Sequence, residues 1–237
     1  MPRPFTIVAL GDSMTECKAI ASARRWPALL QRRLNRAFPG RRFVVINAGV
    51  GGNTSREGLA RLERDALAHR PDLTLVEFGG NDATTDPART VPFAEFTRNL
   101  GALRRRLSGV GSATVWVTFP PVVDVWHGWS NPANAAAREK FLPAGGLDAY
   151  LHEYRRRTRD FAQRHGDLCI DLYGAVRQAI ERDACARYIV QDGVHFTDAG
   201  SRCATACVFA ALHPYLAERG AQAGTGPAIE RCGLRTH

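Results

Sequence analysis

Four short polar clusters carry the side-chain types that transfer of an acyl group requires. The first, Gly11-Asp12-Ser13, directly follows the apolar run Phe5–Leu10. The other three are the glycine-rich stretch "NAGVGGNTS" that begins at Asn47, the cluster "GGND" at 79–82 and the cluster "DGVH" at 192–195. Each cluster alone has the composition of an ordinary turn. A function therefore follows only if the fold brings the four together.

Ser13, His195 and Asp192 have the side chains of a nucleophile, its base and an orienting acid. A serine hydroxyl is a weak nucleophile until a base removes its proton. Histidine titrates near neutral pH, so His195 can take this proton and return it to the leaving group. Asp192, three residues earlier, can hold the imidazole in one tautomer if Gly193 lets the chain turn. The alternative is that Asp192 and His195 only cap the last helix.

The remaining polar groups offer hydrogen-bond donors for a negatively charged intermediate. A tetrahedral oxyanion needs donors that are already in place. The N–H groups of Gly52 and Ser13 and the side-chain amide of Asn81 are suitable. Asp12 and Asp82 flank the proposed site in the sequence. We expect both aspartates to bind backbone N–H groups of the loops, with ordinary turn roles as the alternative.

Strand-like and helix-like segments alternate along the chain and must position these clusters. Five short apolar runs suit strands that are buried on both faces of a parallel sheet. They are Phe5–Leu10, Phe43–Asn47, Leu73–Phe78, Thr114–Phe119 and Leu168–Leu172. Functional groups of such a sheet gather beyond the carboxyl ends of its strands. Three clusters follow the ends of the first three runs, and the fourth follows the fifth run after a further helical stretch, so all four are expected at one edge of the sheet.

Apolar residues between the runs recur at helical spacing. The stripes are Trp26, Leu30, Leu34 and Phe38; Leu59, Leu62 and Ala66; Phe93, Phe96, Leu100, Leu103 and Leu107; and Leu147, Leu151, Tyr154, Thr158 and Phe161. Thr54 and Glu57 form a possible capping box at the start of the second helix. Thr197 or Asp198 is a suitable N-cap for a last helix that runs toward Leu216.

The long connection from Pro121 to Gly146 contains an unusual number of aromatic residues, among them Trp126, His127 and Trp129. A long loop that follows the carboxyl end of a strand is often a substrate-binding loop. His127 is therefore a candidate substrate contact and Trp126 a candidate wall of an apolar or sugar-binding pocket. A surface insertion with its own small hydrophobic cluster explains the same residues equally well.

The length and composition indicate one soluble globular domain. The chain has 237 residues, of which 45% are hydrophobic and 23% charged, which suits one sizeable core. We expect a single domain over residues 1–219 and a flexible tail over 220–237, where Gly, Ala, Gln, Thr and Pro prevail. No apolar stretch reaches the ~20 residues of a membrane span. No signal peptide is evident, so a cytoplasmic location is expected unless an export signal has been removed.

The formal net charge of +9 raises the alternative of a nucleic-acid-binding module. The arginines, however, are spread over several predicted helices, in groups such as Arg32–Arg36, Arg61–Arg64, Arg104–Arg106 and Arg155–Arg157. Each group fits the solvated face of an amphipathic helix, so nucleic acid is an unlikely partner. Cys203 and Cys207 share a helix face without histidine partners, and no metal site is expected.

Taken in order, the clusters "GDSMT", "NAGVGGNTS", "GGND" and "DGVH" resemble the GDSL/SGNH hydrolase family. The resemblance extends from Gly11 to His195, with Met14 where the family name has leucine. It implies a three-layer α/β sandwich with a flavodoxin-like sheet of strand order 2-1-3-4-5. It also implies ester hydrolysis without a metal or cofactor. Residue by residue, it implies a Ser13, Asp192 and His195 triad and an oxyanion hole made by Ser13, Gly52 and Asn81.

The sequence thus predicts a serine esterase that hydrolyses a small-molecule carboxylic ester through an acyl-enzyme. A thioesterase, a carbohydrate deacetylase or an acyltransferase would use the same site, because the clusters define the reaction centre and leave the acyl and alcohol pockets open. The nucleophile elbow G-x-S-x-G of α/β-hydrolases does not match, since Met14 and Thr15 follow Ser13. A basic binding module with a vestigial pocket is the remote alternative.

Overall fold

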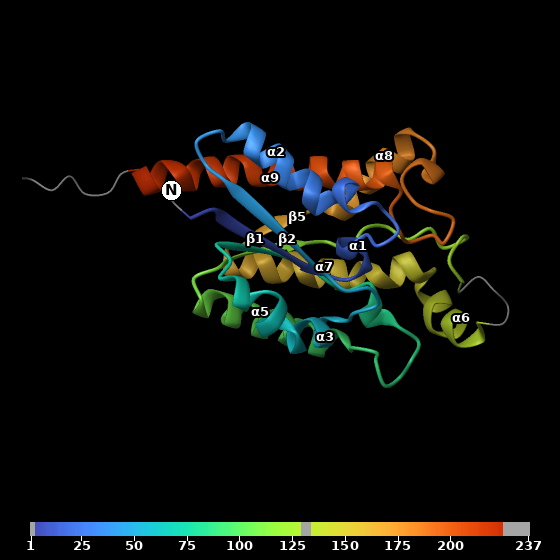
Figure 1. Ribbon diagram of the computed structural model, residues 1–237. Helices are drawn as coiled ribbons and strands as arrows, with labels where there is room; N and C mark the ends of the chain where they lie inside the picture. The colour runs from blue at the N-terminus through green and yellow to red at the C-terminus, as the bar shows by residue number, and fades with distance from the viewer. Residues whose placement is uncertain (1–2, 129–133, 225–237) are drawn as a thin grey trace, which may run out of the picture.

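The five apolar runs form one parallel sheet in the computed structural model, which describes residues 3–128 and 134–224 (Figure 1). The strands lie in the order β2-β1-β3-β4-β5. They are β1 (Phe5–Gly11), β2 (Phe43–Gly49), β3 (Leu73–Glu77), β4 (Ala113–Val117) and β5 (Leu168–Ile170). The central strand β1 pairs with β2 and β3 on its two sides. The flavodoxin-like order expected from the sequence is confirmed.

Helices cover both faces of this sheet (Figure 1). In the described ranges they are α1 (Ser13–Glu16), α2 (Trp26–Ala37), α3 (Ser55–Ala60), α4 (Leu62–Asp65), α5 (Phe93–Gly109), α6 (Ala135–Phe141), α7 (Leu147–His165), α8 (Leu172–Arg182) and α9 (Asp198–Gly224). Helices α2, α8 and α9 lie on one face, and α3, α5 and α7 lie on the other. The predicted three layers are therefore present.

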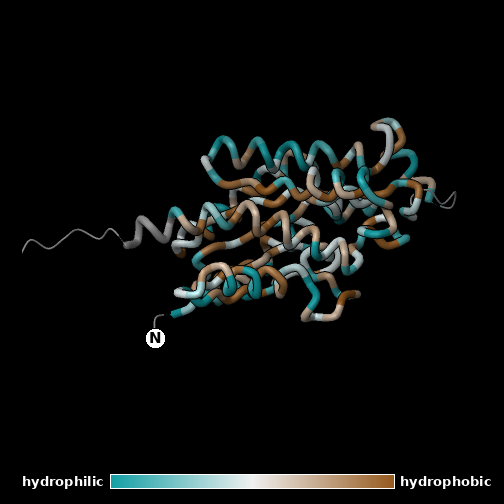
Figure 2. The backbone as a smooth tube through the Cα atoms, turned by 90° about the horizontal axis from the view of Figure 1, so that it is seen from above, coloured by the Kyte–Doolittle hydropathy of each residue, from teal (hydrophilic) through white to brown (hydrophobic). Residues whose placement is uncertain are grey.

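The core lies between the sheet and the apolar stripes of the helices. Residues Ile7 to Leu10 of β1 are fully buried, as a strand covered on both faces must be. Leu30 and Leu34 of α2 are buried against the sheet. Figure 2 shows hydrophobic stretches running through the centre of the molecule and hydrophilic turns on the outer sides of the helices. None of the helices in residues 3–128 and 134–224 is long and apolar enough to cross a bilayer.

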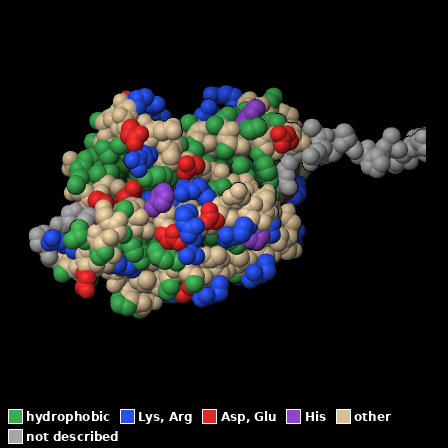
Figure 3. All heavy atoms as spheres, turned by 180° about the vertical axis from the view of Figure 1, so that it is seen from behind, with side chains coloured by type: hydrophobic (Ala, Val, Ile, Leu, Met, Phe, Trp, Pro, Cys, Tyr) green, Lys and Arg blue, Asp and Glu red, His purple; other side chains and the backbone are tan. Residues whose placement is uncertain are grey.

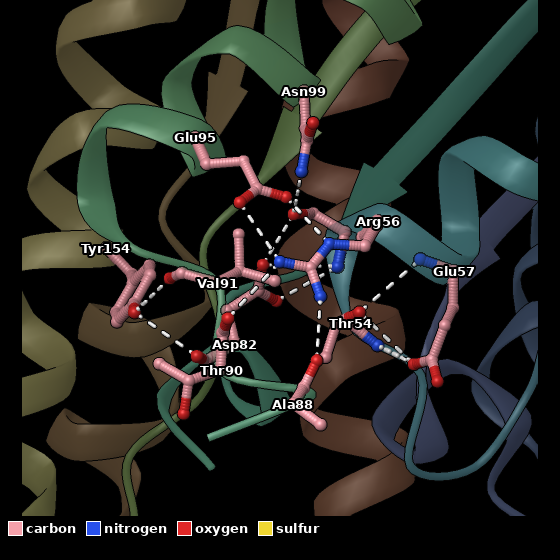
Figure 4. Close-up of polar contacts among 11 residues, drawn as sticks. Thr54, Arg56, Glu57, Asp82, Ala88, Thr90, Val91, Glu95, Asn99 and Tyr154 are labelled. Atoms are coloured by element: carbon pink, nitrogen blue, oxygen red, sulfur yellow. Dashed lines mark hydrogen bonds and ion pairs between the residues drawn. The ribbon is translucent and has the colours of Figure 1, made fainter. Parts of the chain in front are cut away.

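The second predicted helix is interrupted. The capping box at its start is confirmed, because the Thr54 N–H donates to Glu57 Oε2 at 2.7 Å and the Glu57 N–H donates to Thr54 Oγ1 at 3.3 Å (Figure 4). The continuous stripe that we expected is nevertheless divided at Arg61, which separates α3 from α4. Arg61 is 9% exposed, so its assignment to a solvated helix face was wrong.

Arg155 also departs from the expected solvated face. It is 1% exposed and donates to the carbonyl oxygens of Phe119 and Pro120 at 2.9 and 2.8 Å. Its guanidinium pairs with Asp148 at 2.6 Å. Because these acceptors lie just beyond the end of β4, Arg155 fixes the start of the following loop. Elsewhere, as on the face in Figure 3, basic side chains lie among acidic ones and form no single basic field in that view.

Two segments contain more helix than the sequence predicted. The connection from Pro121 to Gly146 includes α6, and Trp129 lies outside the described residues. Helix α9 begins at Asp198, where the preceding Thr197 Oγ1 accepts a hydrogen bond from the Gly200 N–H at 3.2 Å. The helix runs past position 220, where a flexible tail was expected to begin, and reaches Gly224. Residues 225–237 lie outside the described ranges.

Candidate active site

Ser13 lies at the carboxyl end of the central strand, where β1 passes directly into the short helix α1. Asp12 caps this helix, because its Oδ1 accepts a hydrogen bond from the Met14 N–H at 2.9 Å. The helix ends after one turn at Cys17, which has a left-handed conformation with φ 49°. This strand–cap–turn sequence holds Ser13 at the edge of the sheet with its side chain partly exposed.

The structure brings Ser13, His195 and Asp192 together although 182 positions separate Ser13 and His195. His195 Nε2 lies 3.0 Å from Ser13 Oγ. His195 Nδ1 lies 2.6 Å from Asp192 Oδ2. Because a carboxylate can only accept, Nδ1 carries the hydrogen and Nε2 is left as the acceptor for the serine hydroxyl. This arrangement has the geometry of a nucleophile, a base and an orienting acid.

The turn that carries Asp192 is preorganised by its own backbone. Asp192 Oδ1 accepts hydrogen bonds from the N–H groups of Val194 and His195, both at 2.9 Å. Burial alone would raise the pKa of Asp192, but these two N–H groups and the imidazole lower it below its ordinary value. Asp192 is therefore held as a carboxylate against the ring.

Gly193 makes this turn possible. Its backbone φ is +78°, a value that residues other than glycine rarely adopt. A Cβ added at this position would lie 2.5 Å from the Val123 carbonyl oxygen. The Gly193 carbonyl oxygen in turn accepts a hydrogen bond from the Val123 N–H at 2.7 Å. The start of the Pro121–Gly146 connection thus packs directly on the turn that carries His195.

Three N–H donors lie around Ser13 as candidates for an oxyanion hole. The Ser13 and Gly52 N–H groups have no acceptor among the described residues. Gly52 has φ +76°, which turns the glycine-rich loop at this point. The Asn81 amide nitrogen donates to Asp12 Oδ2 at 2.9 Å and to the Asn53 carbonyl oxygen at 3.2 Å. The second of these bonds is the longer and joins Asn81 to the glycine-rich loop.

Two charged residues that the sequence analysis missed hold the glycine-rich loop beside α1. Glu16 Oε2 accepts a hydrogen bond from the Gly51 N–H at 2.8 Å. Arg61 donates to the Ala48 and Gly11 carbonyl oxygens at 2.8 and 2.7 Å. The signal for Arg61 was its position between Leu59 and Leu62 on an apolar stripe, since a charge at such a position needs buried partners.

Asp82 fixes the loop that carries Asn81. Its carboxylate accepts hydrogen bonds from the Ser55 N–H at 3.0 Å and from the Ser55 hydroxyl. The Asn99 amide donates to the same hydroxyl at 3.0 Å, and Tyr154 closes the cluster by donating to the Val91 carbonyl oxygen at 2.7 Å (Figure 4). Burial raises the pKa of Asp82 to about 6 in spite of these donors.

Asp12 is the most perturbed carboxyl group with a direct contact to the candidate donors. It is fully buried. Burial, reinforced by the charge of Asp82, raises the pKa of Asp12 to about 7, although the Met14 N–H opposes the shift. Glu77, the last residue of β3, is buried beside it. Glu77 was not predicted as a site residue from the sequence. The pattern that could have identified it is a carboxylate at the end of an otherwise apolar strand.

A small cavity of about 190 Å³ opens beside Asn81 and His127. Its other lining residues include Thr84, Phe141 and Leu147, which come from the turn that follows Asn81, from the end of α6 and from the start of α7. Burial lowers the pKa of His127, so its ring is held neutral. The cavity therefore combines an apolar wall with a few polar groups.

Trp126, the other aromatic candidate, precedes His127 in the chain and packs half-buried against the core. It does not line this cavity. Residues 3–128 and 134–224 also contain no group of three His, Cys, Asp or Glu side chains that could hold a metal ion.

The fold is a flavodoxin-like α/β sandwich with a serine, histidine and aspartate cluster at the carboxyl edge of its sheet. The chain belongs to the GDSL-like lipase/acylhydrolase family, whose model matches residues 9–203. It is 33% identical over 118 residues to esterase TesA of Pseudomonas aeruginosa, covering 49% of this chain and 56% of that protein. An arylesterase of Vibrio mimicus is 32% identical over 117 residues, covering 48% and 56%. The chain thus spans about half of the length of these curated relatives.

Solved structures share the fold over most of the chain. LAE5, an α/β hydrolase enzyme from the metagenome of Lake Arreo, aligns with a TM-score of 0.71 and 24% identity, covering 88% of this chain and 94% of that one. An acetylxylan esterase of Geobacillus stearothermophilus aligns with a TM-score of 0.69 and 20% identity, covering 87% and 93%. At these identities the likeness concerns the arrangement of the sheet and helices.

Proposed function

We propose that this protein is a serine esterase that hydrolyses carboxylic esters through an acyl-enzyme. The observation that carries the proposal is the chain of contacts from Ser13 Oγ to His195 Nε2 and from His195 Nδ1 to Asp192 Oδ2, at 3.0 and 2.6 Å. Both distances are those of hydrogen bonds along which a proton can move. Membership of the GDSL-like lipase/acylhydrolase family supports the same reaction.

In the first half of the reaction Ser13 Oγ attacks the ester carbonyl carbon while its proton moves to His195 Nε2. Asp192 stabilises the imidazolium that forms. The carbonyl oxygen becomes an oxyanion and accepts hydrogen bonds from the N–H groups of Ser13 and Gly52. The imidazolium then protonates the leaving alcohol as the C–O bond breaks, and the acyl group remains on Ser13.

In the second half a water molecule attacks the acyl carbon and gives its proton to His195. The same donors stabilise the second oxyanion. Collapse of this intermediate breaks the bond to Ser13, which regains its proton from the imidazolium. We expect Asn81 to exchange its longer bond, to the Asn53 carbonyl oxygen at 3.2 Å, for a bond to the oxyanion.

The cavity beside Asn81 supports a preference for short acyl groups. Its volume of about 190 Å³ is below the roughly 300–1,000 Å³ of sites that bury drug-sized ligands. Phe141, which is 3% exposed, closes its apolar side. An acetyl or similarly small acyl group would fit against this wall with its carbonyl oxygen near Asn81.

The polar members of the same cavity favour carbohydrate deacetylation as a second candidate. Thr84, Thr85 and Asn134 offer hydroxyl and amide groups that can bind sugar hydroxyls near a bound acetyl ester. One relative at 31% identity over 85 residues is named as an acetylxylan esterase, and its acetyl substrate is consistent with the cavity. A thioesterase or an acyltransferase would follow the same steps with another leaving group or acceptor.

The test is turnover of p-nitrophenyl esters from acetate to decanoate, beside a panel of acetylated sugars. Ser13→Ala should lower kcat by about 10⁴-fold or more, as loss of a triad nucleophile does. The matched control is Ser108→Ala, an exposed serine near the end of α5, which should turn over like the wild type. Full activity in Ser13→Ala would contradict the proposal, and adding an alcohol acceptor separates transfer from hydrolysis.

A further inference from the structure

Glu77 is a buried carboxyl group next to the helix that carries the nucleophile. The residue is 3% exposed. Its Oε2 accepts a hydrogen bond from the Thr15 hydroxyl at 3.0 Å. Its Oε1 is buried and has no hydrogen-bond partner among the described residues. An unpartnered buried oxygen is costly when the group is charged, and burial raises the pKa of Glu77 well above its ordinary value.

Asp12 is the carboxyl group that faces Glu77. The two side chains lie within hydrogen-bonding reach of each other. Both oxygens of Asp12 already accept bonds from N–H donors, Oδ1 from Met14 at 2.9 Å and Oδ2 from the Asn81 amide at 2.9 Å. Donors of this kind favour the ionised form of a carboxyl group. Glu77 has donors too, the Thr15 hydroxyl and the Asp12 N–H, but its Oε1 is left without one, whereas both oxygens of Asp12 are bonded. When the pair holds a single proton, that proton therefore belongs on Glu77.

We propose that Glu77 is a positioning residue that stays protonated at neutral pH and donates its proton in a hydrogen bond to the carboxylate of Asp12. The bond gives the buried Glu77 carboxyl group a second partner beside Thr15 and fixes Asp12 in one orientation. Asp12 in turn caps the helix that begins at Ser13 and holds the amide of Asn81. One proton thus aligns the nucleophile and an oxyanion donor.

The groups around the pair determine its response to pH. Asp82 adds a negative charge that disfavours ionisation of Asp12, whereas the charge of a protonated His195 favours it; the charge that acts on Glu77 is that of Asp12. Arg61, bonded to the Gly11 carbonyl oxygen at 2.7 Å, is a permanent cation on this side. Burial raises the pKa of the Cys17 thiol to about 12, so it stays neutral. Loss of the proton would place two negative charges in contact, so alignment is present at neutral pH and lost as the pH rises.

Three variants measured from pH 6 to pH 10 test this role, which rests on the proposed esterase function for its activity readout. Glu77→Gln keeps a donor for Asp12 but cannot titrate. We expect its kcat at pH 7 within about threefold of wild type, and an alkaline loss of kcat that is present in wild type and absent in the variant. Glu77→Leu removes the donor and should lower kcat by roughly 10–100-fold with little change in KM, as an unsatisfied buried partner requires.

The control is Glu63→Gln, a change in an exposed glutamate of α4 whose side chain is 73% accessible; its pH profile should follow the wild type. An alkaline loss that persists unchanged in Glu77→Gln, or wild-type kcat in Glu77→Leu, would overturn the proposal.

A second readout requires neither turnover nor a variant. With ¹³C-labelled glutamate side chains in the wild-type protein, one carboxyl resonance should keep its protonated chemical shift through pH 7 and move only at higher pH. If every glutamate carboxyl titrates in the ordinary acidic range, the proposal is wrong. Because this spectrum is independent of the substrate, it separates failure of the Glu77 proposal from failure of the esterase assignment.

Discussion

Replacing Arg61 by Met tests whether one buried guanidinium holds the glycine-rich stretch against the end of β1. Arg61 donates to the Gly11 and Ala48 carbonyl oxygens and to Asn53 Oδ1, at 2.7, 2.8 and 2.7 Å. It also pairs with Asp65 at 3.0 Å. Met retains most of the aliphatic packing and removes all four interactions, so the change isolates the polar contribution.

The expected loss of stability depends on which interactions remain to the groups that Arg61 no longer binds. Removing one partner of a buried ion pair costs about 3–5 kcal/mol, and a buried polar group left without a partner costs about 1–3 kcal/mol. The Gly11 carbonyl oxygen retains the Val50 N–H as a donor at 3.1 Å, and the Asp65 side chain is 18% exposed. We therefore expect Arg61→Met to lower the free energy of unfolding by ~2–4 kcal/mol, or roughly 5–15 °C in Tm for a domain of this size.

Urea unfolding and ester turnover measure the two consequences. The matched control is Arg64→Met, because Arg64 also pairs with Asp65 but its side chain is 77% exposed; its unfolding midpoint in urea should stay close to that of the wild type, since exposed ion pairs add little to stability. At urea concentrations below those that unfold the protein, Arg61→Met should also lower kcat, because the loop that carries Gly52 loses its hydrogen bonds to Arg61. Equal stability losses in Arg61→Met and Arg64→Met would show that the buried hydrogen bonds of Arg61 do not stabilise the protein.

Three further substitutions probe separate parts of the site. Asp192→Asn should keep the fold but lower kcat by about 10²–10⁴-fold, because an amide favours the wrong imidazole tautomer; wild-type kcat would exclude the orienting role. Gly193→Ala should cost about 1–3 kcal/mol of stability through its positive φ and lower kcat, measured by thermal unfolding and turnover; an unstrained, active variant would contradict this. Phe141→Leu should shift the ester-length optimum toward longer acyl chains, and an unchanged optimum would remove the cavity from the acyl site.

The sheet was readable from the sequence because each strand is an apolar run, and β1, β2 and β3 end in polar clusters. The run Phe5–Leu10 followed by Gly11-Asp12-Ser13 defined the end of β1 to within one residue. His195 follows α8 and not a strand end, so its meeting with Ser13 also depended on the turn at Gly193. For the other clusters, a parallel sheet brings the carboxyl ends of its strands to one edge, so their meeting required only the right strand order. The family resemblance supplied this order.

The buried charges were not readable, because burial of a charge depends on partners that are distant in the sequence. Arg155 follows the same pattern as a solvated residue of α7, yet its acceptors are carbonyl oxygens 35 and 36 positions away. Glu77 ends an apolar strand, and its proposed role depends on contact with Asp12, which follows the end of a different strand. The apolar stripe likewise predicted one helix where Arg61 divides α3 from α4, because the spacing of apolar residues does not register the tertiary hydrogen bonds of a buried side chain.

The central claim is that Ser13 is an activated nucleophile. Incubation with diisopropyl fluorophosphate, followed by mass spectrometry of the intact protein and its peptides, tests it most directly. The account predicts one phosphoryl adduct, located on Ser13, that forms in step with loss of esterase activity and does not form in a His195→Ala variant. No adduct, an adduct on another serine, or equally fast labelling of His195→Ala would contradict it.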